Sequence, residues 1–355
     1  MFRKNIYKLC AMFLVFIGCE SQKSQNSDLG QMIDINDFTI DSTMDISVNE
    51  QSMIDEMKWS EREYQQIDDE WPLNALQVLA THNSYHIQPR PDALAEWRYT
   101  HPSLTEQLAL GVRQIELDLH AHPNGFYEVY HLPVIDEVTQ CQLFLDCLQE
   151  IHDWSERNPF HLPLIILIEF KDVIDPYKIT RQKEIDQLML SIWPRTSLIT
   201  PDDIRNPPHT LRQSLLQSGW PSIGSLRGKV MFVLLSGGVH RDAYVDGDEN
   251  LSDRVMFIRG DAERAYGSIV EWGDLRGHED AIEQAYHHNY LIRVKGDDTD
   301  QDEVQQTQQR ESTLANPHAH WLNSDFVNQA QRQEVWGDAL QVLPRCVPAF
   351  CQDMQ

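Results

Sequence analysis

Beyond residue 70, short runs of apolar and often β-branched residues alternate with longer polar stretches. The run over 164–168 is apolar at every position, which is typical of a strand buried on both faces in a helix-covered parallel sheet. Eight runs predict strands at 76–80, 114–119, 127–130, 164–168, 230–235, 255–258, 290–294 and 319–322. The stretches between them predict helices that include 103–110, 143–158, 180–191 and 278–288. The pattern therefore predicts an α/β fold, a TIM-type (β/α)8 barrel, over 71–355.

The amino-terminal segment follows another pattern. Residues 1–19 open with three basic side chains, continue as an apolar run over 9–17 and end at Cys19. The run is about half as long as a membrane-spanning helix, and the segment resembles a bacterial lipoprotein signal peptide. We therefore expect an exported protein, lipidated at Cys19 and anchored to a membrane at the periplasmic face or the cell surface. An ordinary secretory signal or an uncleaved anchor is the alternative.

Residues 20–70 form an acidic stretch with 14 acidic and three basic residues. Its apolar residues are scattered without period, so it cannot bury enough surface to offset the entropy lost on ordering. We predict a flexible, self-repelling tether between the signal and the barrel. An acidic segment that binds a partner is the alternative.

Composition narrows the classes of partner. The chain has 355 residues, a formal net charge of -26 and 41% hydrophobic residues. The hydrophobic content is too high for a wholly disordered chain. Because nucleic-acid binding draws on a basic surface, we expect no nucleic-acid partner. We also expect the chain to be a monomer.

Four of the six cysteines lie in the predicted barrel, as two close pairs. The pairs are Cys141 with Cys147 and Cys346 with Cys351. Four cysteines allow three connectivities, but close pairs favour local disulfides in an oxidising compartment. Zinc binding is the competing interpretation, although neither pair has the spacing of a typical zinc site.

Polar side chains gather where the active site of such a barrel lies, at the carboxyl ends of the strands. They are His82 and Asn83, then Glu116 and Asp118, then His131, then Glu169 and Lys171. Alternate residues of a strand share a face, so Glu116 points with Asp118, and Glu169 points with Lys171. We expect all of these groups to converge on one barrel mouth.

This set has a direct chemical meaning. Three carboxylates and an amide oxygen suit Ca²⁺, with Mg²⁺ the less favoured alternative. Two histidines beside such a cation can move protons or stabilise a charged intermediate, and Lys171 can face a phosphoryl oxygen. The pattern indicates metal-assisted cleavage of a phosphodiester.

Four segments carry a resemblance to a known family. They are Thr-His-Asn-Ser-Tyr at 81–85, Gly-Val-Arg-Gln-Ile-Glu-Leu-Asp at 111–118, His-Leu-Pro at 131–133 and Ile-Glu-Phe-Lys at 168–171. Together they resemble the catalytic half of the calcium-dependent phosphoinositide phospholipases C, with the bacterial secreted branch the nearest likeness. The resemblance extends over about residues 74–328.

The resemblance implies a role for each matching residue. Asn83, Glu116, Asp118 and Glu169 match the calcium ligands of the family. His82 matches the histidine that stabilises the pentavalent phosphorane, and His131 matches the general acid that protonates the departing diacylglycerol. The inositol 2-hydroxyl would attack and give a cyclic phosphate that water can open. Its proton acceptor would be a carboxylate, Glu116 or Glu169.

Substrate contacts are expected from Lys171, Arg293 and Lys295. The branch usually has two arginines where this chain has Arg293 and Lys295, and Asn323 replaces a small hydroxyl residue. These departures touch the substrate-facing rim and therefore the choice of head group. The implied partner is a phospholipid at a membrane surface.

Two other functions stay open from the sequence. One is a glycerophosphodiester or sphingomyelinase-D-like phosphodiesterase on the same barrel, against which Asn83 argues. The other is a surface lipoprotein that binds lipid without turnover, against which the complete set of histidines and carboxylates argues.

Overall fold

A computed structural model describes residues 66–172, 184–297, 303–327, 334–336 and 343–354. The predicted signal segment with Cys19, and the predicted tether as far as residue 65, lie outside the described residues.

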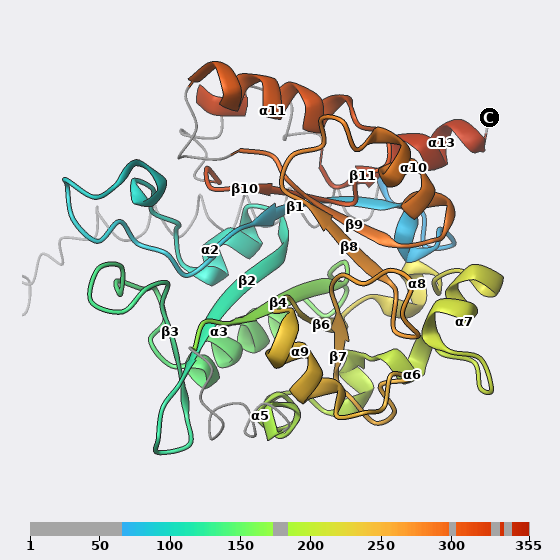
Figure 1. Cartoon of the computed structure of the whole chain (residues 1–355), viewed down its shortest axis with the longest axis horizontal. Coiled ribbons are helices and arrows are strands. Elements are labelled where there is room, and N and C mark those ends of the chain that lie inside the picture. The colour runs from blue at the N-terminus through green and yellow to red at the C-terminus, as the bar shows by residue number, and fades with distance from the viewer. Residues whose placement is uncertain (1–65, 173–183, 298–302, 328–333, 337–342, 355) are drawn as a thin grey trace, which may run out of the picture. The chain divides into compact units, whose positions relative to one another are not determined.

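Eight parallel strands form the centre of the fold (Figure 1). They are β1 (Leu76–Thr81), β2 (Val112–Ala121), β4 (Leu164–Phe170), β6 (Val230–Leu234), β7 (Met256–Ile258), β8 (Ile269–Trp272), β9 (Leu291–Lys295) and β10 (Trp321–Ser324). Each pairs with the next in this order, except that a single bridge joins the end of β7 to β8, and β10 pairs with β1. The predicted α/β barrel is therefore confirmed.

The weakest seam of the barrel lies between β7 and β8. These strands are joined by one parallel bridge, between Arg259 and Ile269, and the Gly260 N–H donates to the Ile269 carbonyl at 2.9 Å. Residues 259–268, all of them described, connect the two strands without a helix. One of the predicted strand and helix units is thus reduced to a loop.

One predicted barrel strand is wrong and another was missed. The run at 127–130 forms β3 (Tyr127–Val129), a short strand antiparallel to the end of β2, outside the parallel ring. The eighth barrel strand is β8 instead, whose sequence Ile-Val-Glu-Trp has only two consecutive aliphatic residues. The apolar pattern did not predict it, because Glu271 interrupts the short apolar run.

The helices cover the outside of the ring. They are α2 (Leu104–Ala109), α3 (Phe144–Arg157), α5 (Ile185–Ile192), α6 (Pro201–Ile204), α7 (Leu211–Ser218), α8 (Ile223–Leu226), α9 (Gly238–Val245), α10 (Glu279–His287), α11 (Glu303–Ala315) and α13 (Pro348–Asp353). Short 3-10 helices are η1 (Leu73–Ala75), η2 (Ala95–Trp97) and η4 (Arg195–Ser197), and minor strands are β5 (Leu198–Ile199) and β11 (Arg345–Cys346). The predicted helices at 103–110, 143–158 and 278–288 are confirmed as α2, α3 and α10.

Alternation along the strands separates two layers of side chains. Ile166 and Phe232 pack in one apolar cluster with residues of α3 such as Leu148. Their neighbours Ile165 and Met231 belong to the second cluster, inside the barrel. By the same alternation, the polar residues toward the carboxyl ends of β2 and β4 share the face of the interior layer. The interior is therefore apolar at one end and polar at the other.

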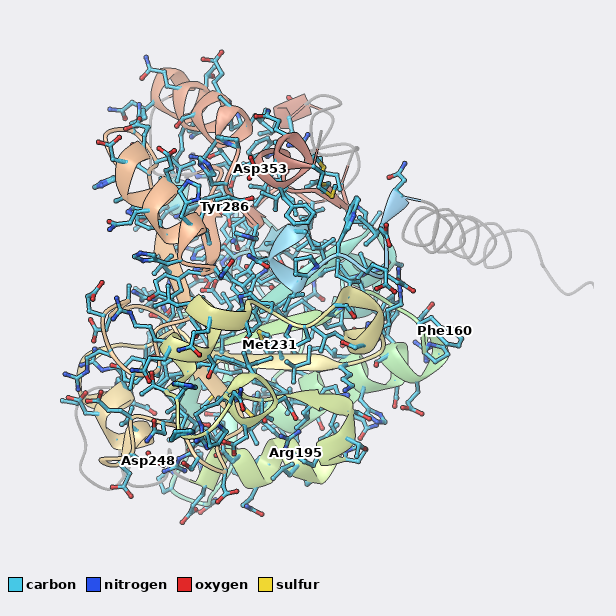
Figure 2. The ribbon with its side chains drawn as sticks, turned by 90° about the vertical axis from the view of Figure 1, so that its right-hand side faces the viewer. Phe160, Arg195, Met231, Asp248, Tyr286 and Asp353 are labelled. Carbon is cyan, nitrogen blue, oxygen red and sulfur yellow. A yellow bond between two sulfur atoms is a disulfide. The ribbon has the colours of Figure 1, made fainter. Side chains whose placement is uncertain are left out.

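The two ends of the barrel differ in what covers them. Figure 1 shows the loops after β1 and after β3 on one side of the ring. Figure 2 views the opposite end, where α10 with Tyr286 and α13 with Asp353 lie close together. Both residues line a pocket of about 420 Å³ there, together with Trp220 and Phe350.

Both predicted cysteine pairs form disulfides, Cys141 with Cys147 and Cys346 with Cys351. The first joins the segment just before α3 to α3 itself, and the second joins β11 to α13. Disulfides of this kind fit a protein that folds in an oxidising compartment. Among the described residues, none of the helices has the length and apolar character needed to cross a bilayer.

Candidate active site

Three carboxylates meet at the carboxyl ends of β2 and β4. Asp118 stands directly opposite Glu169 in the parallel pairing, and Glu116 lies two residues earlier on the same face of β2. One oxygen from each of these three side chains lies within 4.8 Å of the others. Glu116 and Asp118 are buried, and Glu169 is partly exposed at the mouth.

Lys171 lies against this acidic cluster. Its Nζ is 3.0 Å from Asp118 Oδ2 and 2.7 Å from Glu169 Oε2. Burial acts to lower the pKa of Lys171, but the two carboxylates outweigh it and raise the pKa, so the ammonium stays charged. Asp172, the next residue along the chain, accepts the Ala121 N–H at 2.7 Å.

The position of the Arg293 side chain differs from the predicted one. It was predicted to face substrate on the rim, but its side chain is buried, with 6% exposed. The guanidinium crosses the barrel interior from β9, pairs with Glu116, and donates to Glu271 Oε1 at 2.7 Å. The guanidinium also donates a hydrogen bond to Asn323 Oδ1 at 3.2 Å. Arg293 therefore holds one carboxylate of the acidic cluster from behind.

The charges of the cluster explain why it attracts cations. Burial raises the pKa of Asp118 well above its ordinary value despite Lys171, and Glu169 and Glu116 raise it further. Burial acts to raise the pKa of Glu169 as well, but Lys171 outweighs it and lowers the pKa. A divalent cation here would keep Asp118 ionised, since opposite charge favours the charged form.

Asn83 fits the same cation. It follows β1 with a φ of 44°, a left-handed conformation that Asn tolerates better than most residues. Its Oδ1 is buried and accepts no hydrogen bond within the described part of the chain. Hard oxygen donors of this kind, three carboxylates and one amide, match the preference of Ca²⁺. The residues present therefore fit a calcium ion.

His82 is held between two acidic groups. Its Nδ1 is 3.1 Å from Asp325 Oδ1, and its Nε2 is 4.0 Å from Glu116 Oε1. Removal from water lowers the pKa of His82 to about 3, and Lys295 contributes while Glu116 opposes it. The imidazole is thus neutral near pH 7 and can act as a hydrogen-bonding or proton-accepting group.

Sequence reasoning missed the role of Asp325. This residue follows β10, the last barrel strand, and is buried. Its backbone N–H donates to Asp297 Oδ1 at 2.9 Å, which fixes the turn that carries it. Asn323, two positions earlier, stands out in the sequence, but nothing along the chain pairs the Asp325 carboxylate with a histidine 243 positions earlier.

His131 follows β3 and is partly exposed. Its Nδ1 is 2.8 Å from Asp136 Oδ2, and the edge of its ring faces Trp97 with centroids 6.1 Å apart. Asp136 also contacts His86, which lies on the loop that carries His82. The loop that carries His131 therefore contacts the loop that carries His82, through Asp136 and His86.

Lys295 ends β9 on the same face as Arg293 and is partly exposed. Its charge contributes to the lowered pKa of His82, so it lies on the same side of the mouth as that ring. Of the three predicted substrate contacts, Lys171 and Lys295 border the mouth, whereas Arg293 lies beneath it.

A parallel barrel with an acidic cation site at its mouth, His82 beside that site and His131 on an adjoining loop fits a metal-dependent phosphodiesterase. The family model of Ca²⁺-dependent phosphoinositide phospholipase C matches residues 71–128 and 124–346. The chain belongs to this family and is a calcium-dependent phosphoric diester hydrolase. No curated protein sequence matches the chain significantly.

Solved structures agree on the fold. A calcium-dependent phosphoinositol-specific phospholipase C from a Gram-negative Pseudomonas species is 20% identical, with 74% of this chain and 94% of that chain covered and a TM-score of 0.55. The Ca²⁺-dependent enzyme from Streptomyces antibioticus is 20% identical, covering 77% and 99%, with a TM-score of 0.57. The phosphatidylinositol-specific enzyme from Listeria monocytogenes is 16% identical, covering 78% and 96%, with a TM-score of 0.52.

The acidic cluster leads to a first prediction. Calcium should raise the melting temperature of the protein, because a ligand that binds only the native state stabilises it by about 2.7 kcal/mol at 100 times its Kd. Asp118→Asn should weaken calcium binding at least tenfold and abolish most of the rise. Thermal unfolding with calcium and with EGTA measures this.

Asp92→Asn is the matched control, since Asp92 is 86% exposed on the loop after β1 and should keep the full response. An Asp118→Asn protein that responds to calcium like the wild type would contradict the assignment.

Proposed function

We propose that the enzyme cleaves phosphatidylinositol-type phospholipids to diacylglycerol and a cyclic inositol phosphate, through attack by the inositol 2-hydroxyl. The observation that supports this most is the position of His82, which reaches the acidic cluster at Glu116 on one side and Asp325 on the other. A neutral imidazole there can contact a phosphoryl group and the hydroxyl that attacks it.

In this proposal Asn83, Glu116, Asp118 and Glu169 hold the calcium ion. Bound calcium would make the attacking hydroxyl more acidic and offset the negative charge that develops on the phosphoryl oxygens. Glu116 or Glu169 accepts the proton of that hydroxyl. Arg293 holds Glu116 in place through its ion pair.

His82 stabilises the pentavalent phosphorane in its protonated form: Asp325 accepts from Nδ1–H and orients the ring, while Nε2–H donates to a phosphoryl oxygen, and the negative charge of the phosphorane favours this protonated state. His131 is the general acid, giving its proton to the departing diacylglycerol oxygen as the P–O bond breaks. Opening of the cyclic phosphate by water uses the same groups with their proton roles reversed. Lys171 and Lys295 border the phosphate.

This proposal predicts the products and the loss of turnover in two variants. Phosphatidylinositol vesicles with calcium should yield diacylglycerol and inositol phosphates, and EGTA should stop the reaction. His82→Ala and His131→Ala should each lower kcat by about 10² to 10⁴ while leaving the melting temperature nearly unchanged. His287→Ala, at a 62% exposed residue of α10, should keep full activity.

Other outcomes identify the alternatives. Release of the head-group alcohol from glycerophosphodiesters, or of ceramide phosphate from sphingomyelin, would indicate a different phosphodiesterase on this barrel. Vesicle binding with no turnover of any of these lipids would indicate a lipid-binding lipoprotein.

An apolar patch beside His131 supports contact with a membrane surface. The mouth patch consists of Leu94, Val134, Ile135 and Val138, which are 51%, 88%, 44% and 42% exposed. Its two loops adjoin, because the Ile87 N–H donates to the Val138 carbonyl at 3.3 Å. Apolar side chains grouped on a surface mark interaction sites, and these can enter the interfacial layer of a bilayer. The net charge of -26 leaves little general attraction to anionic lipid.

Replacing Val134 and Ile135 together by Ser should lower binding to phosphatidylinositol vesicles and hydrolysis of the lipid several-fold. Hydrolysis of water-soluble inositol cyclic phosphate should not change, since the catalytic groups are untouched. Phe160→Ser is the control, because Phe160 is 61% exposed at the end of the barrel seen in Figure 2. Equal losses on both substrates would contradict membrane contact by the patch.

We further propose that residues 1–19 direct export and lipidation at Cys19, that 20–70 is a tether, and that the 71–355 body acts as a monomer. Cys19→Ala should release the enzyme from the membrane fraction or block its maturation. Cys10→Ala, within the apolar run, should leave membrane fractionation as in the wild type. Unchanged fractionation of the Cys19→Ala protein would contradict lipidation.

A further inference from the structure

Asp136 stands behind His131 in a short loop. Its carboxylate is fully buried and lies 2.8 Å from His131 Nδ1. The loop is already closed by two backbone bonds, since Leu132 and Asp136 exchange N–H to carbonyl bonds of 3.0 Å each. The Asp136 side chain is therefore not needed to close the loop, and its burial requires another explanation.

A second histidine fixes the carboxylate from the other side. His86 Nε2 is 3.0 Å from Asp136 Oδ1, and His86 Nδ1 is 3.0 Å from the Tyr99 carbonyl. The His86 ring is buried and stacks on the ring of Tyr99, with centroids 4.3 Å apart. Asp136 consequently has one orientation, with one face toward His86 and the other toward His131.

A buried carboxylate is costly unless polar partners compensate it. Here the partners are the two imidazoles, and burial, which acts to raise the pKa of Asp136, is outweighed by their hydrogen bonds, so the pKa is lowered. The ionised carboxylate can only accept hydrogen bonds. The His131 nitrogen that faces it must therefore carry a proton.

We propose that Asp136, oriented by His86, is a positioning residue that holds His131 with Nδ1 protonated and Nε2 turned to the substrate. The inference rests on the proposed role of His131 as general acid. In that step the Nε2 proton of His131 passes to the departing oxygen as the P–O bond breaks. The ring is left neutral, with its Nδ1 proton still bonded to Asp136.

This role makes the effect of a substitution depend on the leaving group. A diacylglycerol alkoxide is a poor leaving group and needs a proton, whereas 4-nitrophenolate leaves without one. Asp136→Asn keeps the size of the side chain but removes the charge that selects the His131 tautomer. We expect kcat on phosphatidylinositol to fall about 100-fold, as for other residues that orient a reacting histidine.

On 4-nitrophenyl myo-inositol 1-phosphate, the same Asp136→Asn protein should lose less than about fivefold, because general acid catalysis contributes little there. His86→Gln keeps one donor to Asp136 and should show a smaller loss, about tenfold, that is again confined to the lipid. Asp92→Asn, an exposed carboxylate change in the neighbouring loop, should alter neither rate.

His131→Ala separates this inference from the proposed function. A loss on the lipid with near-normal rates on the nitrophenyl ester confirms His131 as general acid, whereas equal losses on both substrates refute that role and the inference with it. Where His131→Ala is selective, an Asp136→Asn protein that is unselective, or fully active, overturns the inference alone. If Asp136→Asn fails to fold, His86→Gln decides: a selective loss supports the inference, and an unselective loss or full activity overturns it.

Discussion

Mutual repulsion among buried carboxylates is the constraint on which the rest of this structure depends. Glu116, Asp118 and Glu169 bring one oxygen each within 4.8 Å at the polar end of the barrel interior. Such an arrangement is costly unless cations compensate it. Lys171 pairs with two of the three carboxylates, and Arg293 pairs with the third. A bound calcium ion would add two further positive charges to this compensation.

The compensation of these charges also involves residues outside the acidic cluster. Arg293 holds Glu116 with one nitrogen and donates to Glu271 on β8 with the other at 2.7 Å, and Arg259 lies 3.2 Å from Glu271 in turn. The polar face of β8 is thus part of a charge network under the mouth. β8 is also the barrel strand that the sequence did not predict. Glu271 explains both facts, because it takes part in this network and interrupts the apolar run of the strand.

Much of the acidic site could be predicted because its residues are local in the sequence. Glu116 and Asp118 interrupt an apolar strand, and Glu169 ends one, so alternation alone places them on one interior face. The partners of the histidines could not be predicted in this way. Asp325 reaches His82 across 243 positions, and Asp136 meets His86 across 50, so only the closed ring brings them together.

The sequence by itself determined the barrel class, the two disulfide pairs, and which carboxylates share a face, because each depends on spacing along a strand or a short loop. The tertiary structure decided how charges pair across the barrel. It moved Arg293 from the expected rim to the interior, replaced strand 127–130 by β8 in the ring, and gave His82 its acidic partner Asp325. Those pairings depend on distances between side chains that no local pattern encodes, since they arise only when the strands close into a ring.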